Sequence, residues 1–231
     1  MKQNPSHIFR MTHKNNIDIF IEEGYLYALN HKYQKQYAIS YQGINTLRST
    51  MQVFNGKYLH DYVAFYFSPL TPMSYAISKG KVELRDLDNN LKGMVDKSDV
   101  IYFVISLDDL ASLNYETIVS NSACNNFTFE TFKTCDETGI DWSLFNEAPI
   151  KGNISEIDYY GSCRYIQYMD QERYQNRSAI RGAEFLVLDK IKFSDINIIV
   201  VNNEKTKIEI KHKLNEKGID KVVLVKPDCY Y

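Results

Sequence analysis

One acidic residue stands at the start of an apolar run and is the first candidate for a catalytic group. Glu184 lies in the segment 177–187, R-S-A-I-R-G-A-E-F-L-V, whose last residues have the composition of a buried strand. A carboxylate in that position costs several kcal/mol unless it has a partner or a chemical task. The alternative is an acid at a strand edge with no role in chemistry.

Upstream of Glu184, aromatic rings alternate with guanidinium groups. The residues of this aromatic-basic segment are Tyr159, Tyr160, Arg164, Tyr165, Tyr168, Arg173, Tyr174, Arg177 and Arg181. Rings can stack on unpaired bases, and guanidinium groups can hold phosphate. An acid next to such a segment suggests chemistry on nucleic acid, and ordinary tyrosines are the alternative.

Several common chemistries lack their sequence signals. The chain contains no G-x-x-x-x-G-K-[ST], G-x-G-x-x-G, G-x-S-x-G or H-E-x-x-H motif. The five histidines show no metal-ligand spacing, and the four cysteines include no C-x-x-C pair. We therefore expect no metal site and reduced thiols.

Bulk properties predict a single cytoplasmic domain. The 231 residues contain no apolar run of membrane-spanning length, and the N-terminus lacks the apolar core of a signal peptide. A formal net charge of −2 gives no overall attraction to a polyanion, so any nucleic-acid binding must come from a local patch. This excludes a protein that coats duplex DNA broadly.

The hydrophobic patterns predict a mixed α+β fold. Strands are expected at 7–12, 62–67, 100–105, 184–188, 196–201 and 221–225. Helices are expected after Asn15 or Asn16, after Thr71-Pro72, and over 204–217. The last helix lies between two strands, as in a strand-helix-strand unit.

Two segments lack a clear period and are expected to be long loops. The first covers 32–51 and has room for one helical turn; the second covers 114–176, with a possible helix near 128–132. Long irregular segments inside compact domains are usually functional.

The order of several motifs resembles the DarT family of DNA ADP-ribosyltransferase toxins. The motifs are I-F-R-M-T-H-x-x-N-I from residue 8, L-R at 47–48, L-H-D-Y-V-A-F-Y-F-S-P-L-T-P-M at 59–73, I-D-W at 140–142 and A-E-F-L-V at 183–187. They span nearly the whole chain, and the motif at 59–73 is the most specific of them.

The resemblance implies one ADP-ribosyltransferase domain over 1–231, which uses NAD+ to modify a base of single-stranded DNA. Thymidine in a preferred sequence is the expected acceptor, and a macrodomain antitoxin is the implied partner. Two alternatives stay open: the same fold acting on guanine or on RNA, and a module that binds single strands without chemistry.

The resemblance also assigns roles to individual residues. It implies an NAD+-binding loop at about 32–50 and a substrate-recognition loop at about 122–184. The catalytic residues would be Arg48 and Glu184. The residues expected to bind NAD+ are Arg10, Met11, Thr12, His13, Tyr27, Arg48, Tyr66 and Met73, with Phe67 as a further candidate for the nicotinamide slot. From the composition of the aromatic-basic segment, not from the resemblance, the residues expected to contact DNA are Tyr159, Tyr160, Arg164, Tyr165, Tyr168, Arg173 and Arg177.

Two points qualify these assignments. The family often has S-H-A where this chain has Asn121-Ser122-Ala123, so the preferred base stays open. A guanidinium is effectively always protonated, so we expect Arg48 to hold the diphosphate or a base anion rather than to take a proton. His60 and Asp61 are expected to brace the loop.

Overall fold

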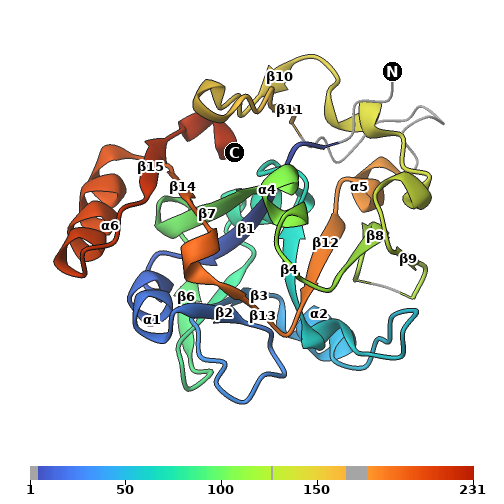
Figure 1. Cartoon of the computed structure of the whole chain (residues 1–231), viewed down its shortest axis with the longest axis horizontal. Coiled ribbons are helices and arrows are strands. Elements are labelled where there is room, and N and C mark those ends of the chain that lie inside the picture. Colours follow the sequence, from blue (N-terminus) through green and yellow to red (C-terminus); the bar gives the residue numbers. More distant parts are fainter. Residues whose placement is uncertain (1–4, 126, 165–175) are drawn as a thin grey trace.

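Strands from both ends of the chain meet in one eight-stranded sheet (Figure 1). The structure is a computed structural model and describes residues 5–125, 127–164 and 176–231. The strand order is β15-β14-β7-β1-β4-β12-β8-β9. The strands are β1 (His7–His13), β4 (Tyr62–Tyr66), β7 (Val100–Ser106), β8 (Thr117–Ala123), β9 (Thr131–Phe132), β12 (Ala183–Leu188), β14 (Ile198–Val201) and β15 (Val222–Val225).

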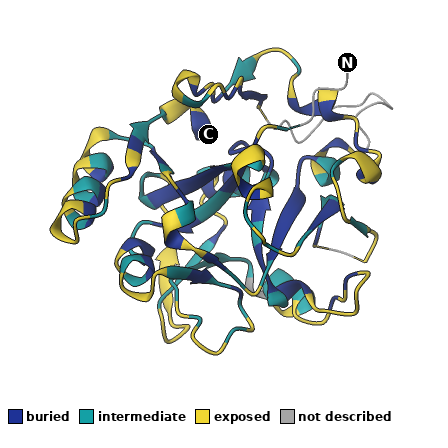
Figure 2. Ribbon diagram, in the orientation of Figure 1, coloured by how far each residue is buried: buried dark blue, intermediate teal, exposed yellow. Residues whose placement is uncertain are grey.

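All six predicted strands are present in this sheet, and the predicted mixed α+β class is confirmed. Only β14 and β15 pair in parallel; the other neighbours are antiparallel. The first six residues of β7 are buried, which explains its apolar run. Figure 2 shows the inner strands as the most buried part of the molecule.

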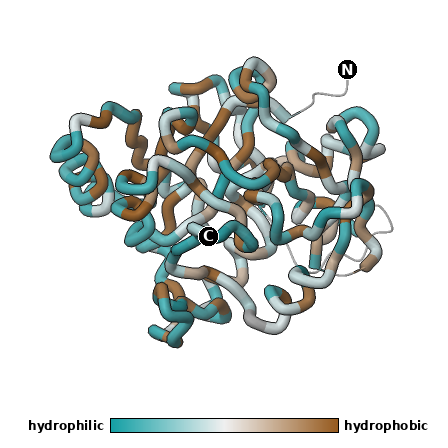
Figure 3. The backbone as a smooth tube through the Cα atoms, turned by 60° about the horizontal axis from the view of Figure 1, so that its bottom comes forward, coloured by the Kyte–Doolittle hydropathy of each residue, from teal (hydrophilic) through white to brown (hydrophobic). Residues whose placement is uncertain are grey.

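The three predicted helices are also present. They are α1 (Asn16–Glu23), α3 (Pro72–Ser78) and α6 (Glu204–Glu216). Thr71 caps α3 by accepting from the Ser74 N–H, and Gly24 ends α1 at a φ of 71°. Helix α6 buries Thr206, Ile210 and Leu214 on one side, and Figure 3 shows hydrophobic and hydrophilic turns alternating along it.

The two segments expected as long loops contain more structure than predicted. The first holds β3 (Ala38–Ser40) and α2 (Gln42–Arg48). The second holds β8, whose sequence T-I-V-S-N-S-A has few apolar residues and is ordered by pairing with β12. The helix expected near 128–132 is wrong, because the strand β9 lies there.

The remaining elements are short. They are β2 (Tyr25–Tyr27), β5 (Glu83–Arg85), β6 (Leu91–Met94), α4 (Leu107–Ala111), β10 (Ile150–Lys151), β11 (Ser162–Cys163), α5 (Arg177–Ile180) and β13 (Lys190–Lys192). The 3₁₀ helices cover Leu59–Asp61, Lys97–Asp99, Asp136–Thr138, Trp142–Phe145, Ser155–Ile157, Phe193–Asp195 and Pro227–Cys229. Strands β3, β5 and β6 form a separate small sheet.

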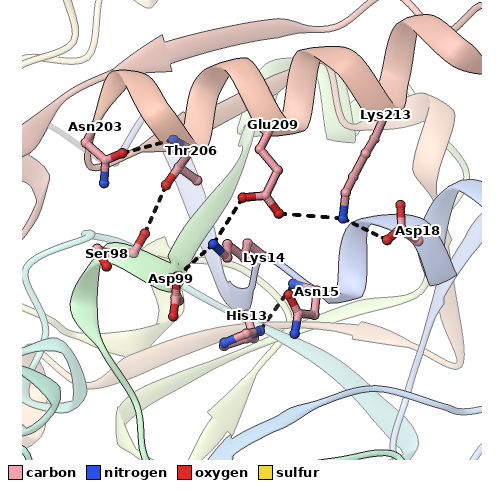
Figure 4. Close-up of polar contacts among 10 residues, drawn as sticks. All are labelled: His13, Lys14, Asn15, Asp18, Ser98, Asp99, Asn203, Thr206, Glu209 and Lys213. Carbon is pink, nitrogen blue, oxygen red and sulfur yellow. Dashed lines mark hydrogen bonds and ion pairs between the residues drawn. The ribbon is translucent and has the colours of Figure 1, made fainter.

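A polar network holds the end of β1 against α6 (Figure 4). The Lys14 ammonium lies 2.9 Å from an Asp99 oxygen and 3.0 Å from a Glu209 oxygen. Lys213 on α6 lies 2.8 Å from Asp18 on α1. The strand that opens the chain is thus tied to the last helix.

The buried Asn16 fixes the segment before β3. Its amide nitrogen donates to the Thr12 hydroxyl at 2.8 Å and to the Tyr37 carbonyl at 2.9 Å, and its oxygen accepts from the Tyr37 N–H at 2.6 Å. Asn15 occupies the N-cap position of α1, but its side chain makes no cap hydrogen bond. Asn16 therefore joins two segments instead of capping the helix.

A bulge lies where β12 pairs with β8. Ala183 pairs with Ala123 and Phe185 pairs with Val119, so an advance of two residues along β12 corresponds to four residues along β8. The Glu184 N–H, which the irregular register removes from the ladder, donates to the Ser120 hydroxyl at 2.8 Å. Just before the bulge, a Cβ on Gly182 would lie 2.7 Å from the Ala123 Cβ. Only glycine fits there without movement of β8 or β12.

Within the described part of the chain, no helix has the length and apolar character needed to cross a membrane. The described residues also contain no cluster of three or more histidines, cysteines or acids that could hold a metal ion. The four cysteines form no disulfide.

Replacing Asn16 should destabilise the fold. Asn16→Ala removes three hydrogen bonds and leaves the Tyr37 backbone unsatisfied, so we expect the free energy of unfolding to fall by about 2–3 kcal/mol in urea denaturation. Asn15→Ala is the matched control and should change it by less than about 0.5 kcal/mol. Equal effects of the two variants would contradict the role given to Asn16.

A methyl group at position 182 should be destabilising in a way that a second change repairs. Gly182→Ala should lower the free energy of unfolding by about 1–3 kcal/mol because of the contact with Ala123. Adding Ala123→Gly removes the opposing methyl and should recover part of that loss. If the double variant is no more stable than Gly182→Ala alone, the close approach is not the cause.

Candidate active site

The chain encloses a cavity of about 470 Å³ where three strands of the sheet meet the segment before α2. Tyr62, Ala64 and Tyr66 alternate along β4 and line one face of it. Glu184 on β12 is the cross-strand partner of Tyr66, so its side chain faces the same space. The volume is typical of a small-molecule site.

Glu184 and Arg48 form a bidentate ion pair in this cavity. The Arg48 Nη1 and Nη2 donate to the two Glu184 oxygens at 2.6 and 2.8 Å, although the residues are 136 positions apart. The Glu184 side chain is 3% exposed and the Arg48 side chain 17%. Arg48 Nη1 also donates to the Cys124 carbonyl at 3.0 Å. Helix α2 supplies the guanidinium from its last turn.

Arg48 stays protonated in this setting. Burial alone would lower the pKa of its guanidinium, but the charge of Glu184 and its hydrogen bonds outweigh burial and raise that pKa above its ordinary value. The arginine is therefore a fixed positive charge and cannot accept a proton.

Burial shifts the pKa of two further polar groups of the cavity. Arg10 donates to the Ala64 carbonyl at 2.9 Å, and burial lowers the pKa of its guanidinium. Burial, with the nearby charge of Glu184, raises the pKa of Tyr66, so its hydroxyl stays neutral. The cavity thus joins a carboxylate, two guanidinium groups and a neutral phenol.

His60 is buried against this cavity with one ring nitrogen unused. It is 7% exposed, and its Nε2 has no hydrogen-bond partner among the described residues. Burial and the positive charge of Arg48 lower the pKa of the ring, so it is neutral at pH 7. A buried polar atom without a partner at a cavity wall is suited to a ligand.

Most residues expected to bind NAD+ line the cavity. They are Arg10, Met11, Thr12, Tyr27, Arg48, Tyr66 and Met73. His13 is absent from the lining; it is buried, and its ring stacks on Tyr37 with the centroids 5.8 Å apart. Phe67 is also absent and packs on Trp142 in the core, so the expectation that it forms the slot is wrong.

The aromatic-basic segment is partly interior. Tyr159 is buried against Phe9, with ring centroids 4.9 Å apart. Arg177 is buried too, 3.1 Å from a Glu147 oxygen and 2.8 Å from the Cys163 sulfur. The expectation that Tyr159 and Arg177 contact DNA is therefore wrong, because these side chains stabilise the interior.

The rest of that segment divides into two groups. Tyr160 is 64% exposed, and Arg164 is exposed with its guanidinium 5.6 Å from the Tyr231 ring centroid. Arg181 is fully buried and donates to the Cys163 sulfur. The other members, Tyr165, Tyr168, Arg173 and Tyr174, lie outside the described residues.

Several cavity residues carried no signal in the sequence. Tyr37, Tyr41, Ile44 and Asn45 come from the first segment expected to be a loop, Cys124 and Asn125 come from the second, and Ser178 and Ala179 lie in α5, just after the second segment. These residues gather only because β8 pairs with β12 and α2 lies across the sheet end. A local pattern could not have found them.

Comparisons with known proteins point to one family. The family profile described as ssDNA thymidine ADP-ribosyltransferase, DarT, matches residues 9–231. A DNA ADP-ribosyl transferase of Thermus sp. strain 2.9 is 30% identical over 135 residues, which are 49% of this chain and 65% of that protein.

Solved structures share the fold. Thermus sp. 2.9 DarT in complex with ADP-ribosylated ssDNA has a TM-score of 0.78 at 23% identity, and in complex with NAD+ a TM-score of 0.73 at 21% identity; each comparison covers 100% of both chains. Thermosipho africanus DarTG in complex with ADP-ribose has a TM-score of 0.65 at 12% identity and covers 98% of this chain and 51% of that one. Because the profile covers nearly the whole sequence, this chain belongs to the DarT family of single-stranded DNA thymidine ADP-ribosyltransferases.

Proposed function

We propose that the chain transfers ADP-ribose from NAD+ to thymidine in single-stranded DNA, with Glu184 and Arg48 as its catalytic residues. The bidentate contact between these two side chains, inside a cavity of ligand size, is the observation that carries the proposal. The family profile and the Thermus structures with NAD+ and with modified DNA support the choice of both substrates.

The cavity has groups that fit each part of NAD+. The guanidinium of Arg10 has donors beyond the one that binds the Ala64 carbonyl, and these suit the diphosphate. Tyr66 and Met73 offer an aromatic and apolar wall for the nicotinamide ring. The unpaired His60 Nε2 supplies a further polar contact.

Glu184 acts on the charge that develops when the nicotinamide bond breaks. Cleavage leaves positive charge on the ribose carbon, and a carboxylate placed beside that carbon stabilises the transition state more than the ground state. The buried setting makes this field stronger than in water. Arg48 occupies one acceptor direction on each oxygen, and the remaining lone pairs can accept the ribose 2′-hydroxyl.

Arg48 orients the carboxylate and stabilises negative charge on the acceptor. Because Glu184 raises the pKa of its guanidinium, we do not assign Arg48 the role of proton acceptor. A planar, permanently charged group beside Glu184 is suited to stabilise a thymine that releases its ring N–H proton to solvent while its nitrogen bonds to the ribose carbon and nicotinamide leaves. The ring nitrogen is hidden in a base pair, which explains the preference for single strands.

The bulge of β8 is the place where this chain departs from the family pattern. Ser122 stands where the family often has histidine and lies in β8 between Val119 and Ala123, the two residues whose pairing with β12 brackets Glu184. We infer that residue 122 affects how the acceptor base approaches Glu184. We also expect a preferred DNA sequence around that base.

A toxin-antitoxin partnership follows from the family. The Thermosipho DarTG chain is about twice the length that this chain covers, and it was solved with ADP-ribose. A macrodomain antitoxin that removes or blocks the modification, in the cytoplasm where the DNA lies, is the partner that we propose.

Loss of the carboxylate should abolish transfer. Glu184→Gln keeps the shape and removes the charge, so we expect at least a 100-fold slower gain of one ADP-ribose unit by a thymidine oligonucleotide, measured by mass spectrometry with NAD+. Oligonucleotides with guanine only, and RNA, are the other arms. Glu22→Gln, an exposed acid on α1, is the control and should match the unaltered chain. Unchanged transfer by Glu184→Gln would overturn the assignment.

Arg48→Lys tests the geometry of the guanidinium. The charge survives but the two parallel hydrogen bonds cannot, so we expect turnover to fall by at least 10-fold. Arg85→Lys is the matched control, because Arg85 also pairs with an acid, Glu83, at 2.8 Å, and does not line the cavity. Near-normal turnover in Arg48→Lys would show that charge alone suffices.

A further inference from the structure

A second cleft, of about 300 Å³, has a wall of exposed aromatic side chains. Its lining is Thr50, Met51, Gln52, Tyr58, Phe127 and Phe129, and we call it the aromatic cleft. Phe127 is 74% exposed and Tyr58 is 40% exposed. Large apolar rings on a surface cost free energy of hydration and commonly mark a binding site.

The aromatic cleft continues the reaction cavity along the same two chain segments. Arg48 lines the cavity and Thr50 the cleft; Asn125 lines the cavity and Phe127 the cleft. Residues two positions apart have Cα atoms no more than about 7 Å from each other. The hydrogen bond from Arg48 to the Cys124 carbonyl joins the two segments at this border. The cleft therefore begins within about one nucleotide of the catalytic pair.

One side of the aromatic cleft is held in place before any ligand binds. Gln52 and Tyr58 form an isolated β-bridge, and the Leu59 N–H donates to the Met51 carbonyl at 3.0 Å. Met51 is 2% exposed and packs in a buried cluster with Leu59. Because the backbone that carries Tyr58 is already ordered, binding at this side of the cleft orders no further chain.

The chemistry of the lining favours a nucleobase as occupant. Aromatic rings stack on any base, and polar neighbours such as Thr50 and Gln52 can reach the edge of a base. Lys57, which precedes Tyr58, is exposed and can meet a phosphate. An extended strand whose thymidine reaches Glu184 must place a neighbouring nucleotide close to the border described above.

We propose that the aromatic cleft binds the nucleotide next to the modified thymidine, by stacking its base on Phe127 and Tyr58. The chain then contacts its acceptor DNA strand at a second nucleotide, beside the modified thymidine. This inference rests on the proposed function and adds a specificity site to it.

The test combines a protein change with a DNA change. Thymidine oligonucleotides are prepared with a normal nucleotide, or an abasic one, on either side of the acceptor, and kcat and KM for DNA are measured. For the unaltered chain, an abasic nucleotide on one of the two sides should raise KM by about 5- to 150-fold. Phe127→Ala should raise KM for the normal strand by a similar factor, and the two changes together should cost no more than either alone.

Controls separate stacking from loss of structure. Phe54→Ala removes a ring that is 53% exposed but does not line the cleft, and it should behave as the unaltered chain. Phe127→Trp should retain a low KM, because it keeps a stacking face. The Kd for NAD+ and the thermal midpoint should stay unchanged in Phe127→Ala, since the side chain is largely exposed.

The outcomes are distinct. If the effects of Phe127→Ala and of the abasic nucleotide on KM multiply, whichever side of the acceptor is abasic, the cleft does not hold the neighbouring base. The same conclusion follows if Phe127→Ala leaves KM unchanged. If the unaltered chain modifies none of the oligonucleotides, the proposed function itself fails and the inference falls with it.

Discussion

Two opposite charges, Arg48 and Glu184, lie buried against each other at the end of the sheet. Burial of either charge alone would cost several kcal/mol, so each is tolerated because the other is present. The same contact fixes the direction of the carboxylate and keeps the guanidinium protonated. Its geometry depends on α2, which carries the arginine, and on β12, which carries the acid, and the rest of the fold serves to bring these two elements together.

The scaffold around the pair combines rigid and irregular parts. Strands β1, β4 and β12 give a fixed floor, because β4 lies between the other two and pairs with both. The bulge in β8 leaves Glu184 out of the ladder between β12 and β8, and the Ser120 hydroxyl accepts from the Glu184 N–H. Asn16 holds the segment that closes the cavity from the other side. Irregular backbone thus occurs where the site needs space, and each irregular point has its own hydrogen bonds.

Much of the sheet could be predicted from the sequence because its strands are buried on both faces and read as apolar runs, as in 100–105. Strand β8 could not, since Thr117–Ala123 is rich in small polar residues and owes its order to β12. For α2 the sequence indicated room for one helical turn within 32–51, but not the bounds of the helix, because this segment has no clear hydrophobic period. The importance of Glu184 followed from one charge in an apolar context, whereas the proximity of Arg48 depended on the family resemblance. The predictions for Tyr159 and Arg177 were wrong because the sequence does not distinguish a buried ring or guanidinium from an exposed one.

The separation of 136 positions between the paired charges also governs when the site can exist during synthesis. Until Glu184 has left the ribosome, the growing chain contains the arginine, the β1 and β4 floor and the closing segment, but no acid to complete the cavity. Nascent fragments that end before Glu184 therefore lack the buried ion pair on which the site depends.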